Sequence, residues 1–380
     1  MKRPLKIAFL HLDEIHHINH FAPVAVSLSR LHDVSIVTYP GNHTYLHATL
    51  EQLKGENVPV LELPTHWFRA LTDRLKKRAL PRKGFWIKKN LPFLFENFDA
   101  FVFTDFFQGY FVNKRGEGKF PKFIKMTHGT PGRAYVFKKV MLDFDFQLLP
   151  GTFYAEELQK RQLLAPHHAV VGYPKLDSVA LRERKPIFSN DKPTVLYNPH
   201  FSAPFSSWHH HGLEILEYFY HQQEFNLIFA PHINLFKHKG GARQDTLPEK
   251  YREAKHMFVD LGSNASVDMT YIKAADLYLG DVSSQVYEFI IEPRPCLFFN
   301  AENRDWQQDT HYRFWKCGDV VTSVEEMKKM LPRAFQQFVK YKPTQQRITD
   351  ENFHSEVDCS PSQRAARAIS DYLEHQKSTT

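Results

Sequence analysis

Two adjacent serines, Ser283 and Ser284, follow a short apolar run that ends in Gly280-Asp281. Apolar residues then recur with helical spacing over 286–290. A helix that begins at the carboxyl end of a strand points its free N–H groups at whatever lies there. The stretch therefore predicts an anion site, and nucleotide phosphates are the usual occupants of such sites. An ordinary strand–helix junction of an α/β protein would give the same pattern.

A second candidate is His128, which lies between a predicted strand, 123–126, and the turn residues Gly129 and Pro131. This places an imidazole on a tight loop at the carboxyl end of a strand. Such a histidine can act as a general base near neutral pH. A turn histidine whose hydrogen bonds are satisfied by the backbone is the alternative.

The loop after the first predicted strand, 6–12, carries His16, His17 and His20. In a doubly wound domain this loop faces the ligand crevice, so the histidines are candidates for contacting an acceptor substrate. A solvated loop is the alternative. No cysteine joins them and the spacing of nearby acids matches no zinc signature, so we expect no metal site.

Segment 66–92 combines nine Lys and Arg residues with a single acid, Asp73, and interleaves two Trp and two Phe. Basic residues mixed with aromatics suit an element that lies on anionic lipid. They would also suit single-stranded nucleic acid, or a solvated basic helix with its aromatics turned inward. We favour the membrane surface and expect no nucleic-acid partner. The residues assigned to this surface are Arg74, Lys76, Lys77, Arg78, Trp86, Lys88 and Lys89.

The elements that must position these groups form two similar α/β halves. A strand–loop–helix–strand pattern opens the chain over 6–39, and strand 194–198 restarts it after a polar run that contains two prolines. The predicted domains are 1–185 and 186–380. Each is a doubly wound α/β domain, and their strand-end loops are expected to face an interdomain cleft that holds the ligand.

Composition agrees with a globular protein of two domains. The 380 residues are 42% hydrophobic and 24% charged, and 33 Phe supply a large core. No apolar run approaches the roughly 20 residues of a membrane span, and the N-terminus is expected to be a strand and not a signal peptide. Three scattered cysteines fit a reducing cytoplasm. The net charge of +7 favours polyanionic or membrane-surface partners. The triple histidine 209–211 is expected in a polar loop.

Three loops occur in a fixed order along the chain, Thr-His-Gly-Thr-Pro at 127–131, Gly-Tyr-Pro-Lys-Leu-Asp at 172–177 and the serine stretch at 280–289. The ordered set resembles the CDP-glycerol glycerophosphotransferase family of teichoic-acid and capsule synthesis. That family carries a His-Gly-Thr-Pro loop, a Gly-Tyr-Pro-Arg-Asn-Asp-like turn and an Asp-Tyr-Ser-Ser segment. The resemblance covers roughly residues 100–345. It implies a GT-B fold, two Rossmann-like domains around a cleft, with no metal or other cofactor required.

The resemblance implies roles by position. His128 matches the family's catalytic histidine, which would deprotonate the acceptor hydroxyl, and His232 matches a second histidine that would stabilise charge near the donor phosphates. Ser283 and Ser284 match the serines that hold the donor pyrophosphate, and Glu288 suits a ribose or glycerol hydroxyl. The remaining assignments are Asp281, His200, Gly172, Tyr173 and Pro174 to the donor, and His16, His17, Gly129 and Thr130 to the acceptor.

The chain also departs from the family pattern. Val282 stands where the family has Tyr, and Lys175-Leu176 where it has Arg-Asn. The family's Pro-Thr-Trp-Arg becomes Pro-His-Phe-Ser at 199–202, and the lost Arg removes a bidentate phosphate contact that His200 would take over. These differences bear on the identity of the donor.

The activity that the resemblance implies is transfer of a polyol phosphate, with glycerol phosphate as the first candidate. The donor is CDP-linked, the acceptor is a hydroxyl of a lipid-linked or polymeric cell-surface glycan, and CMP leaves. Segment 66–92 would hold the cytoplasmic enzyme peripherally on the inner face of the plasma membrane. Three alternatives remain open: a GT-B sugar transferase, a relative of UDP-sugar epimerases, and a non-catalytic polyanion- or glycan-binding protein.

Overall fold

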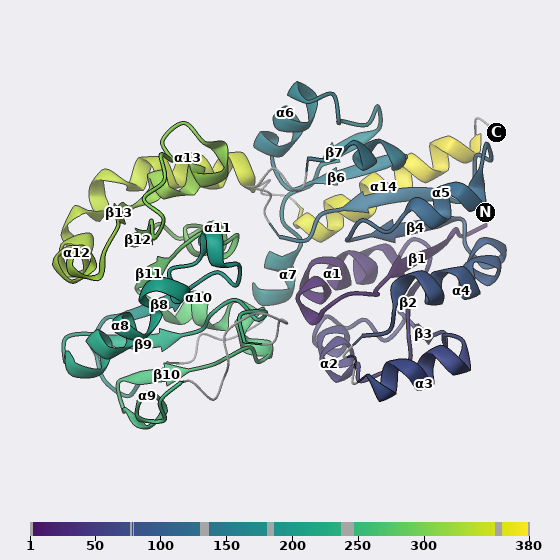
Figure 1. Ribbon diagram of the computed structural model, residues 1–380. Helices are drawn as coiled ribbons and strands as arrows, with labels where there is room; N and C mark the ends of the chain where they lie inside the picture. The colour runs from purple at the N-terminus through teal and green to yellow at the C-terminus, as the bar shows by residue number, and fades with distance from the viewer. Residues whose placement is uncertain are drawn as a thin grey trace. The chain divides into compact units, whose positions relative to one another are not determined.

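The chain forms two compact units (Figure 1). The computed structural model describes residues 3–76, 78, 80–129, 137–180, 186–236, 247–353 and 359–378. The first unit contains Met1–Arg182 and Glu351–Thr380, and the second contains Glu183–Asp350. The first boundary lies close to the expected division at 185. The end of the chain differs from the expected single domain 186–380, because it returns to the first unit.

Helix α14 (Pro361–Ser378) explains this return. Ala365, Ile369 and Leu373 recur every four residues, are fully buried, and share one hydrophobic core with α1 (Ile18–Leu28). A helix with an apolar stripe must bury that stripe against a partner. The amphipathic pattern predicts the helix from the sequence. It does not show on which of the two sheets the helix packs.

The first unit is built on a seven-stranded sheet of order β3-β2-β1-β4-β5-β6-β7, in which every neighbouring pair is parallel. The strand order reverses between β1 and β4, and open α/β sheets bind ligands at such a switch point. The strands are β1 (Lys6–Leu10), β2 (Asp33–Thr38), β3 (Val60–Glu62), β4 (Ala100–Phe103), β5 (Lys122–Met126), β6 (Phe146–Leu149) and β7 (His168–Val170). The helices besides α1 and α14 are α2 (Thr44–Gln52), α3 (Trp67–Leu75), α4 (Lys83–Asn97), α5 (Gly109–Arg115), α6 (Thr152–Lys160) and α7 (Lys175–Ala180).

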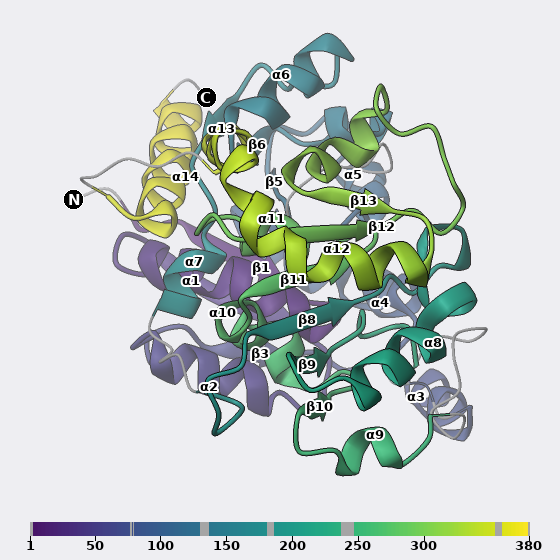
Figure 2. The same cartoon turned by 90° about the vertical axis from the view of Figure 1, so that its left-hand side faces the viewer.

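The second unit repeats this plan with a six-stranded parallel sheet of order β10-β9-β8-β11-β12-β13, whose strands Figure 2 shows one below another. Its switch point lies between β8 and β11. The strands are β8 (Thr194–Asn198), β9 (Asn226–Phe229), β10 (Met257–Val259), β11 (Leu277–Gly280), β12 (Cys296–Phe299) and β13 (Asp319–Val321). The helices are α8 (Trp208–His221), α9 (Lys250–Glu253), α10 (Thr270–Ala274), α11 (Gln285–Phe289), α12 (Val324–Gln337) and α13 (Lys342–Asn352).

Hydrophobic cores cover both faces of the first sheet. On one face α1 and α14 pack on strand residues such as Phe9 and Val102, and on the other α4 and α5 pack on a cluster of phenylalanines. Phe101, Phe103 and Phe111 lie in that cluster with ring centroids between 5.1 and 6.4 Å apart. Parallel strands buried on both faces are continuously apolar, which is why the central strands can be predicted from sequence.

The edges of the sheets are harder to predict than their centres. The predicted strand 194–198 coincides with β8, whereas three of the four edge strands, β3, β7 and β13, are three residues long, only partly buried and were not predicted. The triple histidine 209–211 lies in the first turn of α8 and not in a loop, so that expectation is wrong. Its helix is stabilised by buried residues further along, such as Ile215 and Phe219, which anchor the apolar face.

Candidate active site

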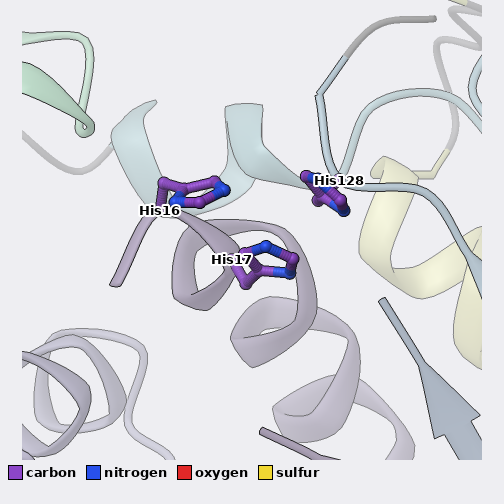
Figure 3. A group of neighbouring side chains, drawn as sticks. All are labelled: His16, His17 and His128. Atoms are coloured by element: carbon purple, nitrogen blue, oxygen red, sulfur yellow. The ribbon is translucent and has the colours of Figure 1, made fainter. Parts of the chain in front are cut away.

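A cluster of histidines lies at the carboxyl ends of the first unit's strands (Figure 3). His16 and His17 lie in η1 (Ile15–His17), a turn of 3₁₀ helix between β1 and α1, and His128 follows β5. The ring centroids of His17 and His128 are 3.8 Å apart, and those of His16 and His17 are 4.3 Å apart. The fold thus brings the predicted base next to two histidines that were predicted to contact the acceptor.

Thr104, which directly follows β4, orients two of these rings. Its carbonyl oxygen accepts a hydrogen bond from Nδ1 of His128 at 2.6 Å, and its hydroxyl lies 2.9 Å from Nδ1 of His17. A carbonyl oxygen can only accept, so neutral His128 carries its proton on Nδ1 and a lone pair on Nε2. Base catalysis by Nε2 requires this tautomer.

Burial keeps His17, His20 and His128 uncharged at neutral pH. It lowers the pKa of His128 to about 4, and the nearby ammonium of Lys125 adds to the effect. Burial also holds the pKa of His17 and of His20 well below the usual value. The same cause lowers the pKa of Lys125 to about 7, and its Nζ donates to the Thr104 carbonyl at 2.8 Å. His128 is therefore neutral and able to accept a proton.

His20 connects this cluster to the Gly-Tyr-Pro turn. The backbone N–H of Gly129 donates to Nε2 of His20 at 3.3 Å, and the Tyr173 ring packs edge-on against His20 with centroids 5.2 Å apart. Gly172 and Gly129 have φ of +88° and +73°, where a side chain would be strained. Gly172, Tyr173 and Pro174, which were predicted to contact the donor, thus belong to the first unit, near the predicted acceptor residues.

A charged triad at the same strand ends was not predicted. Nζ of Lys83 contacts Oδ1 of Asp13 and lies 3.1 Å from Oδ2 of Asp105. Burial alone would raise the pKa of Asp105, but Lys83 and the backbone N–H of Phe106 outweigh it and lower this pKa to about 2. In the sequence Lys83 is one of the nine cations of segment 66–92. The position of both carboxylates just after strands was the available signal.

In the second unit, Asp281 braces the loops at the switch point between β8 and β11. Its Oδ2 accepts hydrogen bonds from the backbone N–H groups of His200 at 3.0 Å and Ser207 at 2.9 Å. Its carbonyl oxygen accepts from Nε1 of Trp315 at 2.9 Å. Burial raises the pKa of Asp281 to about 7, against the effect of these donors. Asp281, which was predicted to contact the donor substrate, thus holds the loop that follows β8 through hydrogen bonds to its backbone.

Ser283 and Ser284 directly precede α11, as the sequence predicted. Ser283 is buried and its Oγ accepts from the backbone N–H of Gln285 at 3.2 Å, whereas Ser284 is exposed. Because α11 has only five residues, its dipole is small, and local N–H groups and hydroxyls are what this junction offers an anion. Glu288 is buried within α11.

His200 and His232 lie together after β8 and β9. Their ring centroids are 5.7 Å apart, and Phe201 packs against both. Nδ1 of His200 accepts from the backbone N–H of Ser202 at 3.0 Å, and Nδ1 of His232 from that of Asn234 at 3.2 Å. A ring nitrogen that accepts carries no proton, so each neutral ring carries its proton on Nε2. Both histidines therefore present donors, which suits a bound anion.

Helix α3 exposes an apolar face. Trp67, Leu71 and Leu75, spaced four residues apart, are 79%, 51% and 73% exposed, and Phe68 is 42% exposed. Side chains at this spacing lie on one side of a helix. Exposed apolar groups of this size on one helix are unusual for a surface that contacts only water.

The predicted membrane-surface residues divide into two groups. Arg74, Lys76, Arg78, Lys88 and Lys89 are exposed. Trp86 is fully buried in α4, packed on the phenylalanine side of the sheet with its Nε1 donating to the Leu63 carbonyl, so its assignment is wrong. Lys77, like Thr130 of the predicted acceptor site, lies outside the described residues. Among the helices that the structure describes, none is both long and apolar enough to cross a membrane.

Comparison with known proteins gives a family and a fold. The family model described as CDP-glycerol:poly(glycerophosphate) glycerophosphotransferase matches residues 38–371. No curated protein sequence gave a match. Among solved structures, the wall teichoic acid polymerase TagF soaked with CDPG has a TM-score of 0.61 at 14% identity, with 99% of this chain and 90% of that chain covered.

Two further structures share the fold. UDP-GlcNAc 2-epimerase from Neisseria meningitidis, bound to UDP-GlcNAc, has a TM-score of 0.58 at 12% identity, with 97% of this chain and 99% of that chain covered. UGT73P12 from Glycyrrhiza uralensis has a TM-score of 0.67 at 14% identity, with 99% and 97% covered. Identities this low establish the fold alone, and the predicted GT-B architecture of two Rossmann-like domains is confirmed.

Proposed function

The chain belongs to the CDP-glycerol:poly(glycerophosphate) glycerophosphotransferase family, and from this premise we propose that it transfers glycerol phosphate from CDP-glycerol to a glycan hydroxyl. The acceptor oxygen attacks the β-phosphorus, and the bond from that phosphorus to the bridging oxygen breaks. CMP leaves with the bridging oxygen, and the acceptor's proton passes to Nε2 of His128.

The observation that carries this proposal is the tautomer of His128. Its Nδ1 donates to the Thr104 carbonyl, so Nε2 is the proton acceptor. A pKa near 4 makes His128 a weak base. In a loose phosphoryl-transfer transition state the attacking hydroxyl loses its proton late, when it has become acidic, so a weak base is sufficient.

The second unit supplies the groups for the donor. Nε2–H of His200 and of His232 would donate to the diphosphate oxygens, together with the hydroxyls of Ser283 and Ser284. Ser202 stands where the family pattern has an arginine. His200, two residues earlier, would replace part of the phosphate contact that this arginine makes in the family. Hydrogen-bond donors of this kind neutralise the developing charge on CMP, so we propose that transfer needs no resident metal.

The membrane surface is the second part of the proposal. The exposed face of α3, Trp67, Phe68, Leu71 and Leu75, would enter the headgroup region of an anionic membrane, with nearby cations such as Lys76 contacting lipid phosphates. A peripheral position on the inner leaflet would bring the enzyme to a lipid-linked acceptor of teichoic-acid or capsule type.

The donor is tested by thermal shift and by product analysis with the full chain. We expect CDP-glycerol to raise the melting temperature more than CDP-ribitol, UDP-GlcNAc or GDP-mannose, and CMP to be released when a glycerol-phosphate-primed lipid acceptor is added. Release of UDP or GDP would instead support a sugar transferase. Turnover of UDP-GlcNAc without an acceptor would support an epimerase, and no nucleotide-dependent shift would support a binding protein.

Membrane binding is tested by sedimentation with vesicles of phosphatidylglycerol and phosphatidylcholine. We expect Leu71→Asp to reduce the bound fraction at least about tenfold, because a charge would replace an inserted apolar group. Val339→Asp, at an exposed position of the second unit, is the matched control and should bind as the wild type does. Equal binding by Leu71→Asp and the wild type would contradict the assignment of α3.

A further inference from the structure

The histidine cluster offers more than one proton acceptor. His16, His17 and His128 each have a ring nitrogen, and these three nitrogens lie within 4.8 Å of one another. Figure 3 shows the three rings gathered at the start of α1 and the loop after β5. A single general base does not require two further imidazoles at this distance. Three imidazoles do match the ligand set of a transition-metal ion.

The hydrogen bonds around the cluster have the pattern found behind metal-bound histidines. Nδ1 of His128 donates to the Thr104 carbonyl, and Nδ1 of His17 lies 2.9 Å from the Thr104 hydroxyl. Metal-ligating histidines usually have one ring nitrogen tied to a backbone or side-chain oxygen, which orients the other toward the metal. One residue, Thr104, thus orients Nε2 of two of the three rings.

Charged groups near the cluster act in both directions. Lys125 and Lys83 oppose a cation, whereas the carboxylate of Asp105 near His128 favours it.

Sequence spacing alone could not show this set. His16 and His17 are adjacent and His128 follows far downstream, which matches no zinc signature. The parallel sheet makes the arrangement, because the loops after β1 and β5 end on the same edge. The expected absence of a metal site therefore rested on local spacing only.

We propose that His16, His17 and His128 form a site for a borderline divalent cation of the Zn²⁺ class, and that the bound ion blocks transfer. Hard cations such as Mg²⁺ prefer oxygen ligands and are not expected here. The blocking half rests on the proposed function, since an ion on Nε2 of His128 removes the lone pair that accepts the proton.

The geometry also limits the affinity. Zn–N bonds of about 2.0–2.1 Å on a tetrahedral ion place ligand nitrogens about 3.4 Å apart, so nitrogens that lie up to 4.8 Å apart must approach by up to about 1.4 Å. His16 lies in the short η1 turn with about a third of its side chain exposed, and it is the ring with most room to move. We therefore expect binding weaker than that of a preformed structural zinc site.

The test begins with metal binding in the absence of any substrate. The full chain is freed of metal with a chelator, and Zn²⁺ and Co²⁺ are titrated with a competing dye and by visible absorption. The variant His209→Ala/His210→Ala/His211→Ala serves as the background, because His209 and His210 are exposed and the triple histidine could bind zinc by itself. We expect this variant to bind one Zn²⁺ or Co²⁺ ion per chain. Bound Co²⁺ should show the visible absorption bands of an ion with nitrogen ligands.

The site is then assigned with single variants in the same background. His16→Ala and His128→Ala should each weaken Zn²⁺ binding at least about tenfold, while His47→Ala, an exposed histidine of the same unit, should leave it unchanged. Circular dichroism establishes that each variant is folded. Unchanged affinity in both site variants would overturn the proposed site.

Inhibition is measured separately as CMP release with and without Zn²⁺. We expect one bound equivalent of Zn²⁺ to abolish release and a chelator to restore it. Zinc that binds at the cluster without reducing CMP release would overturn the blocking half of the proposal. A chain that binds zinc at these histidines but never releases CMP would contradict the proposed function and leave the metal site standing.

Discussion

The two units share the order of six parallel strands and carry histidines of opposite hydrogen-bonding character at the carboxyl ends of their strands. In the first unit, the loops after β1 and β5 carry His17, His20 and His128, and Nε2 of His128 is a proton acceptor. In the second, the loop after β8 and the turn after β9 present Nε2–H donors from His200 and His232. What differs is the partner of Nδ1. A carbonyl oxygen makes Nε2 an acceptor, and a backbone N–H makes it a donor.

Under the proposed function, this difference would let one type of sheet supply the base in the first unit and the phosphate contacts in the second. The sheet fixes where the loops end, and a single backbone contact then sets the tautomer of each histidine. Each of the following predictions changes one of these contacts or charges, from the largest expected effect to the smallest.

Removing the proton acceptor should have the largest effect. His128→Ala should lower the rate of CMP release by about 10²- to 10⁴-fold, the usual contribution of a general base. The measurement is the steady-state rate with saturating CDP-glycerol and acceptor, with His47→Ala as an exposed control in the same unit. A rate within about twofold of the wild type would refute the assignment of His128 as the base.

Asp281 should make the stability of the second unit depend on pH. Its folded pKa of about 7 lies above the roughly 3.9 of an unfolded aspartate, so the folded state binds more protons between about pH 4 and 7. Its contribution therefore becomes less favourable as pH rises through that window, by up to about 4 kcal/mol. Asp281→Asn should remove this dependence in urea unfolding at pH 5 and pH 7.

Asp105 of the first unit should behave in the opposite way. Its folded pKa of about 2 means that its stabilising contribution is present above about pH 4 and is lost as pH falls toward 2.

The control for Asp281→Asn is Asp191→Asn, a substitution at an exposed position, which should keep the wild-type dependence of stability on pH. If Asp281→Asn keeps it as well, then burial does not raise the pKa of Asp281.

The smallest effect is expected at Thr104. Thr104→Val removes the hydroxyl near Nδ1 of His17 but leaves the carbonyl that fixes His128. A buried polar group that loses its partner costs about 1–3 kcal/mol, which urea unfolding would detect, while CMP release should stay within about threefold of the wild type. Thr104→Ser should restore the stability. A hundredfold loss of turnover would mean that the hydroxyl also controls the base.

The sequence predicted what local pattern controls. The central strands are mostly apolar runs, and His128, Ser283 and Ser284 each follow one of them, so their positions at strand ends could be predicted. Trp86 was misassigned because a basic aromatic segment does not show which face of its helix is buried. The Lys83 triad and the three-histidine cluster depend on pairing between distant strands, and no local spacing encodes that pairing.

The central claim is that the second unit binds the donor while His128 of the first unit acts as the base. The most direct test is the affinity of two histidine variants for CDP-glycerol, measured by calorimetry without acceptor. His232→Ala should weaken donor binding at least about tenfold, because a charge-assisted hydrogen bond to the diphosphate is lost. His128→Ala should leave the affinity within about twofold of the wild type. Equal losses in both variants, or a loss in His128→Ala alone, would contradict the account.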